Sequence, residues 1–247
     1  MQFSCFPSRV YDSANTAMDE PSESEDRMNG IPGWLPFCVA AIPCAAAIYG
    51  TVPARGADVI ADWPSITMPP PPELKPVTLD GKTTALLIID IQAPACTTER
   101  PRCAESIPKI KALMDRARAA GALVAYTLPS GKIADPGIAP HDGEVVEQKP
   151  GRPDKFLGTD LDQRLKNRGI KTVIICGTSA QGVGIGTGSA SAQRGYNVIY
   201  PVDGVSSESA FREAYAAWHM GGGGPPVTTR WVTVTRSDMI KFETANH

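Results

Sequence analysis

The chain has 247 residues, of which 42% are hydrophobic, and it carries a formal net charge of −2 with a pI near 5.9. This length is enough for one sizeable α/β core but too short for two such domains and a leader. A net charge so close to zero leaves no excess of clustered lysine and arginine, which a nucleic-acid-binding surface needs. Nucleic acid is therefore not an expected partner.

Residues 1–56 resemble a leader that is removed. An acidic stretch is followed by the almost entirely apolar segment 31–52, and Ala54 and Gly56 place small side chains at the −3 and −1 positions of an export cleavage site. We expect a signal peptide and a periplasmic or secreted mature protein without a stable membrane span. The alternative is an uncleaved membrane anchor, because about 20 apolar residues can span a bilayer. The long stretch ahead of Met28 makes this methionine an alternative start.

Residues 57–82 predict an extended, proline-rich arm. The segment contains four consecutive prolines at 69–72 and another at Pro76. Proline fixes φ and has no backbone N–H, so we expect neither a helix nor a central strand here. Such an arm could wrap the domain or reach a second subunit.

Strand and helix patterns alternate from residue 83 to residue 247. The expected strands are 84–90, 122–127, 144–147, 171–176, 196–200 and 230–234, and the expected helices are about 106–120, 159–168, 182–194 and 208–220. Strands separated by helices imply parallel βαβ units with right-handed crossovers. The sequence therefore predicts an α/β domain over 83–247: a three-layer α/β/α Rossmann-like fold with a mostly parallel sheet of about six strands.

Several polar features follow the ends of the predicted strands. Asp90 ends an otherwise apolar strand, where an acid is costly to bury without a purpose; the structural alternative is a carboxylate that caps a loop. The Gly177–Val183 turn follows the strand at 171–176, and a long loop leads to Lys149. Ligands of open parallel sheets bind beyond the carboxyl ends of the strands, so we expect these features to meet at one edge.

This order of pieces resembles the isochorismatase-like cysteine hydrolases, a superfamily that includes nicotinamidases and related amidases. The resemblance covers roughly residues 83–242 and rests on the Asp90 strand, Phe156-Leu-Gly-Thr-Asp-Leu161, the Gly177 turn with Thr187, and Gly195-Tyr196. It implies that Asp90 is a general base and that Lys149 is the cation beside it. Lys155 ranks below Lys149, because a small or apolar residue normally precedes the phenylalanine.

The resemblance places the family's catalytic cysteine on Val183, whose side chain has no lone pair to attack with. It also implies an oxyanion hole built from the backbone N–H groups of Ser179 and Val183, with a cis peptide bond between Thr178 and Ser179. Backbone donors survive a change of side chain, so a carbonyl-binding pocket can persist without the cysteine. Asp90 could then activate water directly against a bound carbonyl.

Three of the six cysteines remain after the leader: Cys96, Cys103 and Cys176. In an oxidising compartment Cys96 and Cys103 can close a short disulfide loop, which contributes about 2–3 kcal/mol by loop-entropy reasoning. The alternative is that one of them has become the nucleophile. Cys176 ends a buried strand, where a thiol is usually inert.

No metal or cofactor is expected. The chain has three histidines, and none has ligand spacing to another. His219, on a helix with Tyr215 and Trp218, is expected to be a packed side chain.

We therefore expect an isochorismatase-like hydrolase that acts on a small amide or a related carbonyl or enol-ether substrate. The main alternative is a non-catalytic member that retains the pocket as a small-molecule-binding site, and a third is an interaction protein that assembles through its arm. A homo-oligomer is expected from the resemblance. The substrate depends on the loops 93–105 and 129–148, whose conformation the sequence does not specify.

Overall fold

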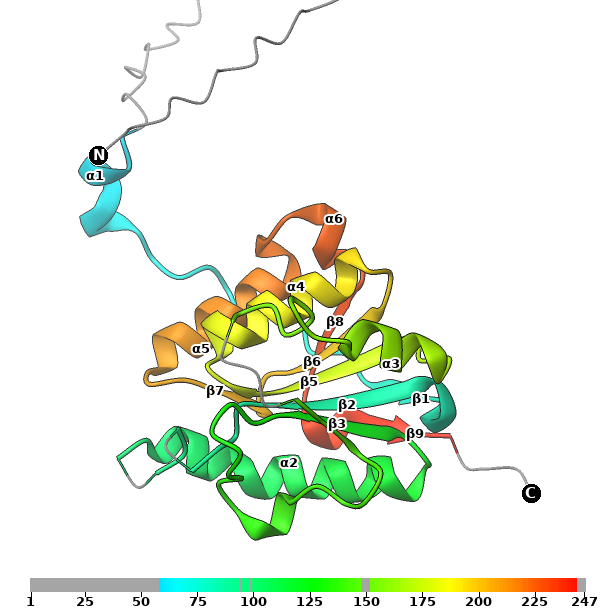
Figure 1. The fold of residues 1–247 in the computed structure, drawn as a ribbon. Helices are drawn as coiled ribbons and strands as arrows, with labels where there is room; N and C mark the ends of the chain where they lie inside the picture. Colours follow the sequence, from blue (N-terminus) through cyan, green and yellow to red (C-terminus); the bar gives the residue numbers. More distant parts are fainter. Residues whose placement is uncertain (1–57, 94, 98, 148–151, 244–247) are drawn as a thin grey trace, which may run out of the picture. The chain divides into compact units, whose positions relative to one another are not determined.

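The computed structural model describes residues 58–243 apart from 94, 98 and 148–151. The expected leader and Lys149 lie outside the described residues. The main sheet has the strand order β4-β3-β2-β5-β6-β8, and β7 pairs with the end of β5 (Figure 1). All of these pairings are parallel. The strands are β2 (Thr84–Ile89), β3 (Leu123–Thr127), β4 (Val145–Glu147), β5 (Thr172–Thr178), β6 (Asn197–Pro201), β7 (Val205–Ser206) and β8 (Val232–Thr235).

Helices cover both faces of this sheet. They are α2 (Pro101–Ala119), α3 (Leu161–Asn167), α4 (Ile185–Gln193), α5 (Ala210–Trp218) and α6 (Pro226–Thr229). Helix α2 lies on one face, and α3, α4 and α5 lie on the other (Figure 1). The expected three-layer α/β fold is confirmed.

Strand β2 lies between β3 and β5 in the main sheet, and both of its faces are buried. Leu87 belongs to the core cluster shared with α3 and α4, whereas Leu86 belongs to the cluster shared with α2. Side chains alternate between the two faces of a strand, so a strand that is buried on both sides has a continuous apolar sequence. This explains why the run before Asp90 contains no polar residue beyond its first position.

The carboxyl ends of β2 and β5 lie level with each other. Ile89 is the register partner of Gly177, which has a φ of 149°. A Cβ atom at position 177 would lie 2.1 Å from the carbonyl oxygen of Ile89. Only glycine allows this approach, which brings the turn after β5 next to Asp90.

The arm contains one helix and one short strand that is not part of the main sheet. Helix α1 (Val59–Asp62) forms because Asp58 accepts a hydrogen bond from the backbone N–H of Ile60 at 2.9 Å, and residues 58–63 contain no proline. Strand β1 (Val77–Leu79) pairs in parallel with β9 (Ile240–Phe242) in a separate two-stranded sheet. The expectation that this segment contains no helix was therefore wrong for α1.

Two helix starts differ from the predicted ones by three residues or more. Helix α2 begins at Pro101 rather than at 106, because proline is tolerated in the first turn of a helix. A wide π-helical turn, Ala180–Gly184, precedes α4, which begins at Ile185 rather than at 182. None of the helices in the described part of the chain has the length and apolar character needed to cross a bilayer.

Candidate active site

Asp90 and Lys155 form a buried ion pair at the carboxyl edge of the main sheet. Lys155 Nζ donates to Asp90 Oδ2 at 2.6 Å, and the two side chains are only 6% and 14% exposed respectively. Removing either charge would leave the other buried without its partner, which is strongly unfavourable. The two residues therefore act as one unit.

Strand β3 holds the other side of the Asp90 carboxylate. Thr127 Oγ1 donates to Asp90 Oδ1 at 2.7 Å, and the backbone N–H of Asp90 donates to the Thr127 carbonyl at 2.9 Å. Asp90 has a φ of 56°, a left-handed conformation that few residues other than glycine adopt. Such outliers cluster at functional sites. Both carboxylate oxygens contact side chains from other segments, which differs from the loop-capping alternative.

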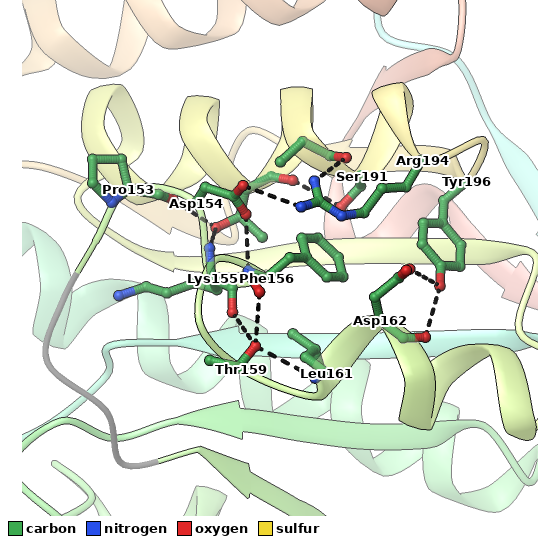
Figure 2. A network of polar contacts seen from close by, with 12 residues as sticks. Pro153, Asp154, Lys155, Phe156, Thr159, Leu161, Asp162, Ser191, Arg194 and Tyr196 are labelled. Atoms are coloured by element: carbon green, nitrogen blue, oxygen red, sulfur yellow. Dashed lines mark hydrogen bonds and ion pairs between the residues drawn. The ribbon is translucent and has the colours of Figure 1, made fainter.

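The lysine beside Asp90 is Lys155, which sequence reasoning ranked below Lys149. Lys149 lies outside the described residues, so its position stays a prediction. Figure 2 shows the side chains of Lys155 and Phe156 pointing in opposite directions from the same loop. Phe156 is buried in the core, so its neighbour is directed away from it. The sequence analysis counted this position before Phe156 against Lys155, and the ion pair with Asp90 shows that a lysine is accommodated there.

The turn after β5 has the backbone form that the resemblance implied. The peptide bond between Thr178 and Ser179 is cis. The backbone N–H groups of Gly182 and Gly184 both donate to the Ser179 carbonyl at 3.1 Å. A Cβ atom at Gly182 would lie 2.8 Å from Ser179 Oγ, so glycine there leaves room for the hydroxyl. These contacts hold Ser179 and Val183 in one compact turn.

No thiol nucleophile is available in this turn. Val183 is partly buried and packs against the core cluster shared with α3 and α4. Cys176 is buried inside β5, and burial raises the pKa of its thiol well above the ordinary value, so it stays protonated. Cys96 and Cys103 form a disulfide with Cα atoms 5.1 Å apart. The disulfide leaves neither of these two sulfur atoms as a free thiol, contrary to the relocated-nucleophile alternative.

The disulfide-closed loop is connected to the turn through a chain of polar contacts. Arg100 pairs with Glu208, whose Oε2 lies 2.9 Å from Ser207 Oγ. Ser207 Oγ in turn lies 2.6 Å from Gln181 Oε1, inside the turn. Hydrogen bonds from its own backbone N–H and from Ser207 lower the pKa of Glu208 to about 2. Glu208 is therefore a permanent anion near neutral pH and not a candidate base.

Other candidates contribute nothing to this centre. Partial burial lowers the pKa of His219, whose ring lies 6.0 Å from that of Tyr215. Among the residues with described positions, no group of three or more His, Cys, Asp or Glu side chains could hold a metal ion. Two hollows of about 420 and 280 Å³ contain neither Asp90 nor Lys155 among their lining residues. A smaller hollow is lined by Thr127 and Lys155, beside the ion pair.

Comparison with known proteins agrees with this geometry. The family model described as the isochorismatase domain matches residues 84–230, which contain Asp90, Lys155 and the turn. The chain belongs to the isochorismatase family. An isochorismatase-family protein from Bacillus subtilis, YwoC, is 28% identical over 162 residues, covering 54% of this chain and 82% of that protein. The secreted isochorismatase effector Isc1 of Verticillium dahliae is 29% identical over 145 residues, covering 53% and 76%.

Solved structures of the isochorismatase family share the fold. An isochorismatase-family protein from Desulfovibrio vulgaris has a TM-score of 0.56 at 23% identity, covering 63% of this chain and 95% of that one. The N-carbamoylsarcosine amidase of Thermoplasma acidophilum has a TM-score of 0.52 at 21% identity, covering 66% and 99%. These two solved structures share the fold of this chain, and one of them is an amidase.

Proposed function

We propose that this isochorismatase-family protein hydrolyses a small amide, or a related carbonyl or enol-ether compound, without a cysteine nucleophile. The observation that carries the proposal is the buried Asp90–Lys155 pair, with both carboxylate oxygens of Asp90 fixed. A buried acid and base pair of this kind is costly for stability alone, and such pairs are common at functional sites.

In the proposed reaction Asp90 is the general base. Its carboxylate takes a proton from a water molecule as the water oxygen bonds to the substrate carbonyl carbon. The backbone N–H groups of Ser179 and Val183 donate to the oxygen that becomes negative, which is the role of an oxyanion hole. When the carbon–nitrogen bond breaks, the leaving nitrogen takes the proton from Asp90. Lys155 keeps a positive charge beside Asp90 throughout.

Val183 supports a mechanism without a covalent intermediate. A valine side chain cannot attack a carbonyl, and Cys176 is buried and protonated. Water activated by Asp90 requires no further residue. Lys149, the lysine that the resemblance placed beside Asp90, lies outside the described residues, and that placement stays a prediction.

The second candidate function is small-molecule binding without turnover. Val183 favours it, because this side chain packs against the core where the resemblance places the nucleophile. The oxyanion-hole donors and the Asp90–Lys155 pair would then hold a ligand instead of transforming it.

An assay on a panel of compounds distinguishes the two functions. The panel contains small amides, including nicotinamide and N-carbamoylsarcosine, and enol ethers. Turnover is measured for the natural protein and for Val183→Cys, and binding is measured in parallel by calorimetry. Hydrolysis by the natural protein supports the proposed enzyme. Binding of a panel compound without hydrolysis, with turnover only in Val183→Cys, supports the binding function instead.

We also propose that the protein is exported and assembles as a homo-oligomer. The Cys96–Cys103 disulfide and a secreted relative, Isc1, support export, because disulfides persist in oxidising compartments. Mass spectrometry of the protein isolated from its own cells tests cleavage directly. A chain that begins at Ala57 is the expected result, and a chain that retains residues 31–52 contradicts it. Light scattering of the same material gives the oligomeric state, and a monomer mass contradicts the second part.

A further inference from the structure

We propose that Arg194 is a positioning residue, which fixes the direction of Lys155 toward Asp90 although it touches neither of them. Arg194 is the first residue after α4 and lies on the far side of the loop that carries Lys155 (Figure 2). Its importance for turnover rests on the proposed function, whereas its effect on Lys155 itself does not.

Helix α4 binds the backbone on both sides of this loop position. Thr187 Oγ1 donates to the Pro153 carbonyl at 2.8 Å and accepts from the backbone N–H of Lys155 at 3.3 Å. A Cβ atom at Gly186 would lie 2.7 Å from the backbone of Pro153, so glycine allows this contact. The loop is therefore held directly against the first turns of α4.

Arg194 contacts both sequence neighbours of Lys155. Its Nη2 atom donates to Asp154 Oδ2 at 3.4 Å, and its Cζ atom lies 4.6 Å from the centre of the Phe156 ring. Its Nη1 atom donates to the Ala190 carbonyl at 3.0 Å, which ties the guanidinium to the end of α4. A cation is stabilised at the carboxyl end of a helix. One side chain thus connects the helix to the residues before and after Lys155.

Phe156 is held between two partners. The ring of Tyr196 lies 6.1 Å from the Phe156 ring with an interplanar angle of 11°. Tyr196 donates from its hydroxyl to Asp162 Oδ1 at 2.8 Å, which fixes the tyrosine (Figure 2). With Phe156 held in this way, rotation of the loop that would turn Lys155 away from Asp90 is opposed.

Asp154 contacts both Phe156 and Arg194. Its Oδ1 atom accepts from the backbone N–H of Phe156 at 2.8 Å while Oδ2 contacts Arg194. On the other side, Thr159 Oγ1 donates to the Lys155 carbonyl at 2.8 Å. The backbone N–H, the carbonyl and both neighbours of Lys155 are therefore all occupied, and its side chain is left to meet Asp90.

The geometry requires arginine and not merely a positive charge. A guanidinium is planar, so it can lie over an aromatic face while its edge donates to a carboxylate. A lysine ammonium could pair with Asp154 but could not cover Phe156 in the same way. Arg194→Lys is therefore expected to retain only part of the effect.

The test measures the chemical accessibility of Lys155 in the full chain. The proteins are treated with a low concentration of acetic anhydride at a fixed pH, and the rate of acetylation of each lysine is read by peptide mass spectrometry. In Arg194→Ala the acetylation rate at Lys155 should rise about tenfold. The variant lacks one cation–π contact and one ion pair, and a tenfold change matches the stabilisation that these two contacts give the loop together. Arg194→Lys should give a smaller rise, and the exposed Lys241 serves as an internal reference.

Arg236→Gln is the matched control, since it removes an exposed ion pair with Asp238 far from Lys155 in the sequence. It should leave the Lys155 rate unchanged. Each variant is measured at the same interval below its own melting temperature, so that global destabilisation is matched. An unchanged Lys155 rate in Arg194→Ala overturns the proposal, as does an equal rise in Arg236→Gln. If Arg194→Ala does not fold, Arg194→Lys is the test: an increased Lys155 rate supports the proposal, and an unchanged rate overturns it.

The proposed function and this inference fail separately. The acetylation rate needs no substrate, so it tests Arg194 even if no panel compound is hydrolysed. Where a substrate is found, Arg194→Lys should lower kcat and leave KM nearly unchanged, because Lys155 is misdirected while the binding turn is intact. A change in KM alone would contradict a role in positioning Lys155.

Discussion

Thr127 Oγ1 and Asp90 Oδ1 lie 2.7 Å apart, across the carboxyl ends of two neighbouring strands. This contact fixes one oxygen of the carboxylate and leaves the other to Lys155. A hydroxyl at this place in β3 thus orients the carboxylate that we propose as the general base. It connects the fold to the proposed chemistry, because the register of β2 and β3 places the two groups together.

Thr127→Val should weaken both stability and activity. The substitution retains the shape of the side chain but removes the hydrogen bond to a charged group, which costs about 1.5–3 kcal/mol. Urea unfolding measures the loss of stability, and turnover on any panel substrate measures the loss of activity. Thr233→Val, on the edge strand β8, is the control and should change neither by a comparable amount. Equal effects at the two positions would contradict the role given to Thr127.

Lys155→Met should leave Asp90 buried without its cation and lower the free energy of unfolding by about 3–5 kcal/mol. The double variant with Asp90→Asn should recover part of that loss, because the unpaired charge is then absent. A double-mutant cycle by chemical denaturation measures this coupling. Lys149→Gln is measured beside it. A larger coupling of Asp90 to Lys149 than to Lys155 would reverse our assignment of the lysine.

Removing the disulfide should affect stability but not the chemical step. Cys96→Ser with Cys103→Ser should lower the free energy of unfolding by about 2–3 kcal/mol through loop entropy. Turnover at 25 °C should persist, since neither sulfur takes part in the proposed reaction. Thermal unfolding and a kinetic assay of the same sample test the two statements. Loss of turnover in a variant of unchanged stability would restore the relocated-nucleophile alternative.

Glu208 should contribute to the acid sensitivity of the protein. Its pKa is lowered from an ordinary value of 4.5 to about 2, so its stabilising effect is complete above pH 4.5 and is lost as the pH falls toward 2. Glu208→Gln should therefore lower stability at pH 6 and reduce its decline between pH 4.5 and 2. Glu73→Gln, at an exposed position, is the control. Equal pH profiles for the natural protein and Glu208→Gln would contradict this assignment.

The sequence was most informative where the core determines the structure. The apolar run before Asp90 predicts a central strand, and the parallel order places Asp90 and Gly177 at one edge, as the structure has them. The cis bond at Thr178–Ser179 was implied by resemblance and is present. Helix α1 was missed, because the prolines nearby obscured the capping role of Asp58.

The choice of lysine was not predictable from spacing alone. Lys149 and Lys155 lie in the same irregular segment, and the distance to Phe156 along the chain does not give the direction of a side chain. That direction depends on Arg194, Thr187 and Tyr196, which come from later elements. Contacts between segments so distant in sequence are determined by the three-dimensional fold and are absent from any local pattern.

The most direct test of the central claim is the turnover of Asp90→Asn compared with that of the natural protein, on the best substrate of the panel. The isosteric amide retains the shape of the side chain but cannot take a proton from water at neutral pH. We expect a loss of kcat of at least about 100-fold, the usual contribution of a general base, with substrate binding retained in calorimetry. Unchanged turnover in Asp90→Asn would contradict a reaction centred on the Asp90–Lys155 pair.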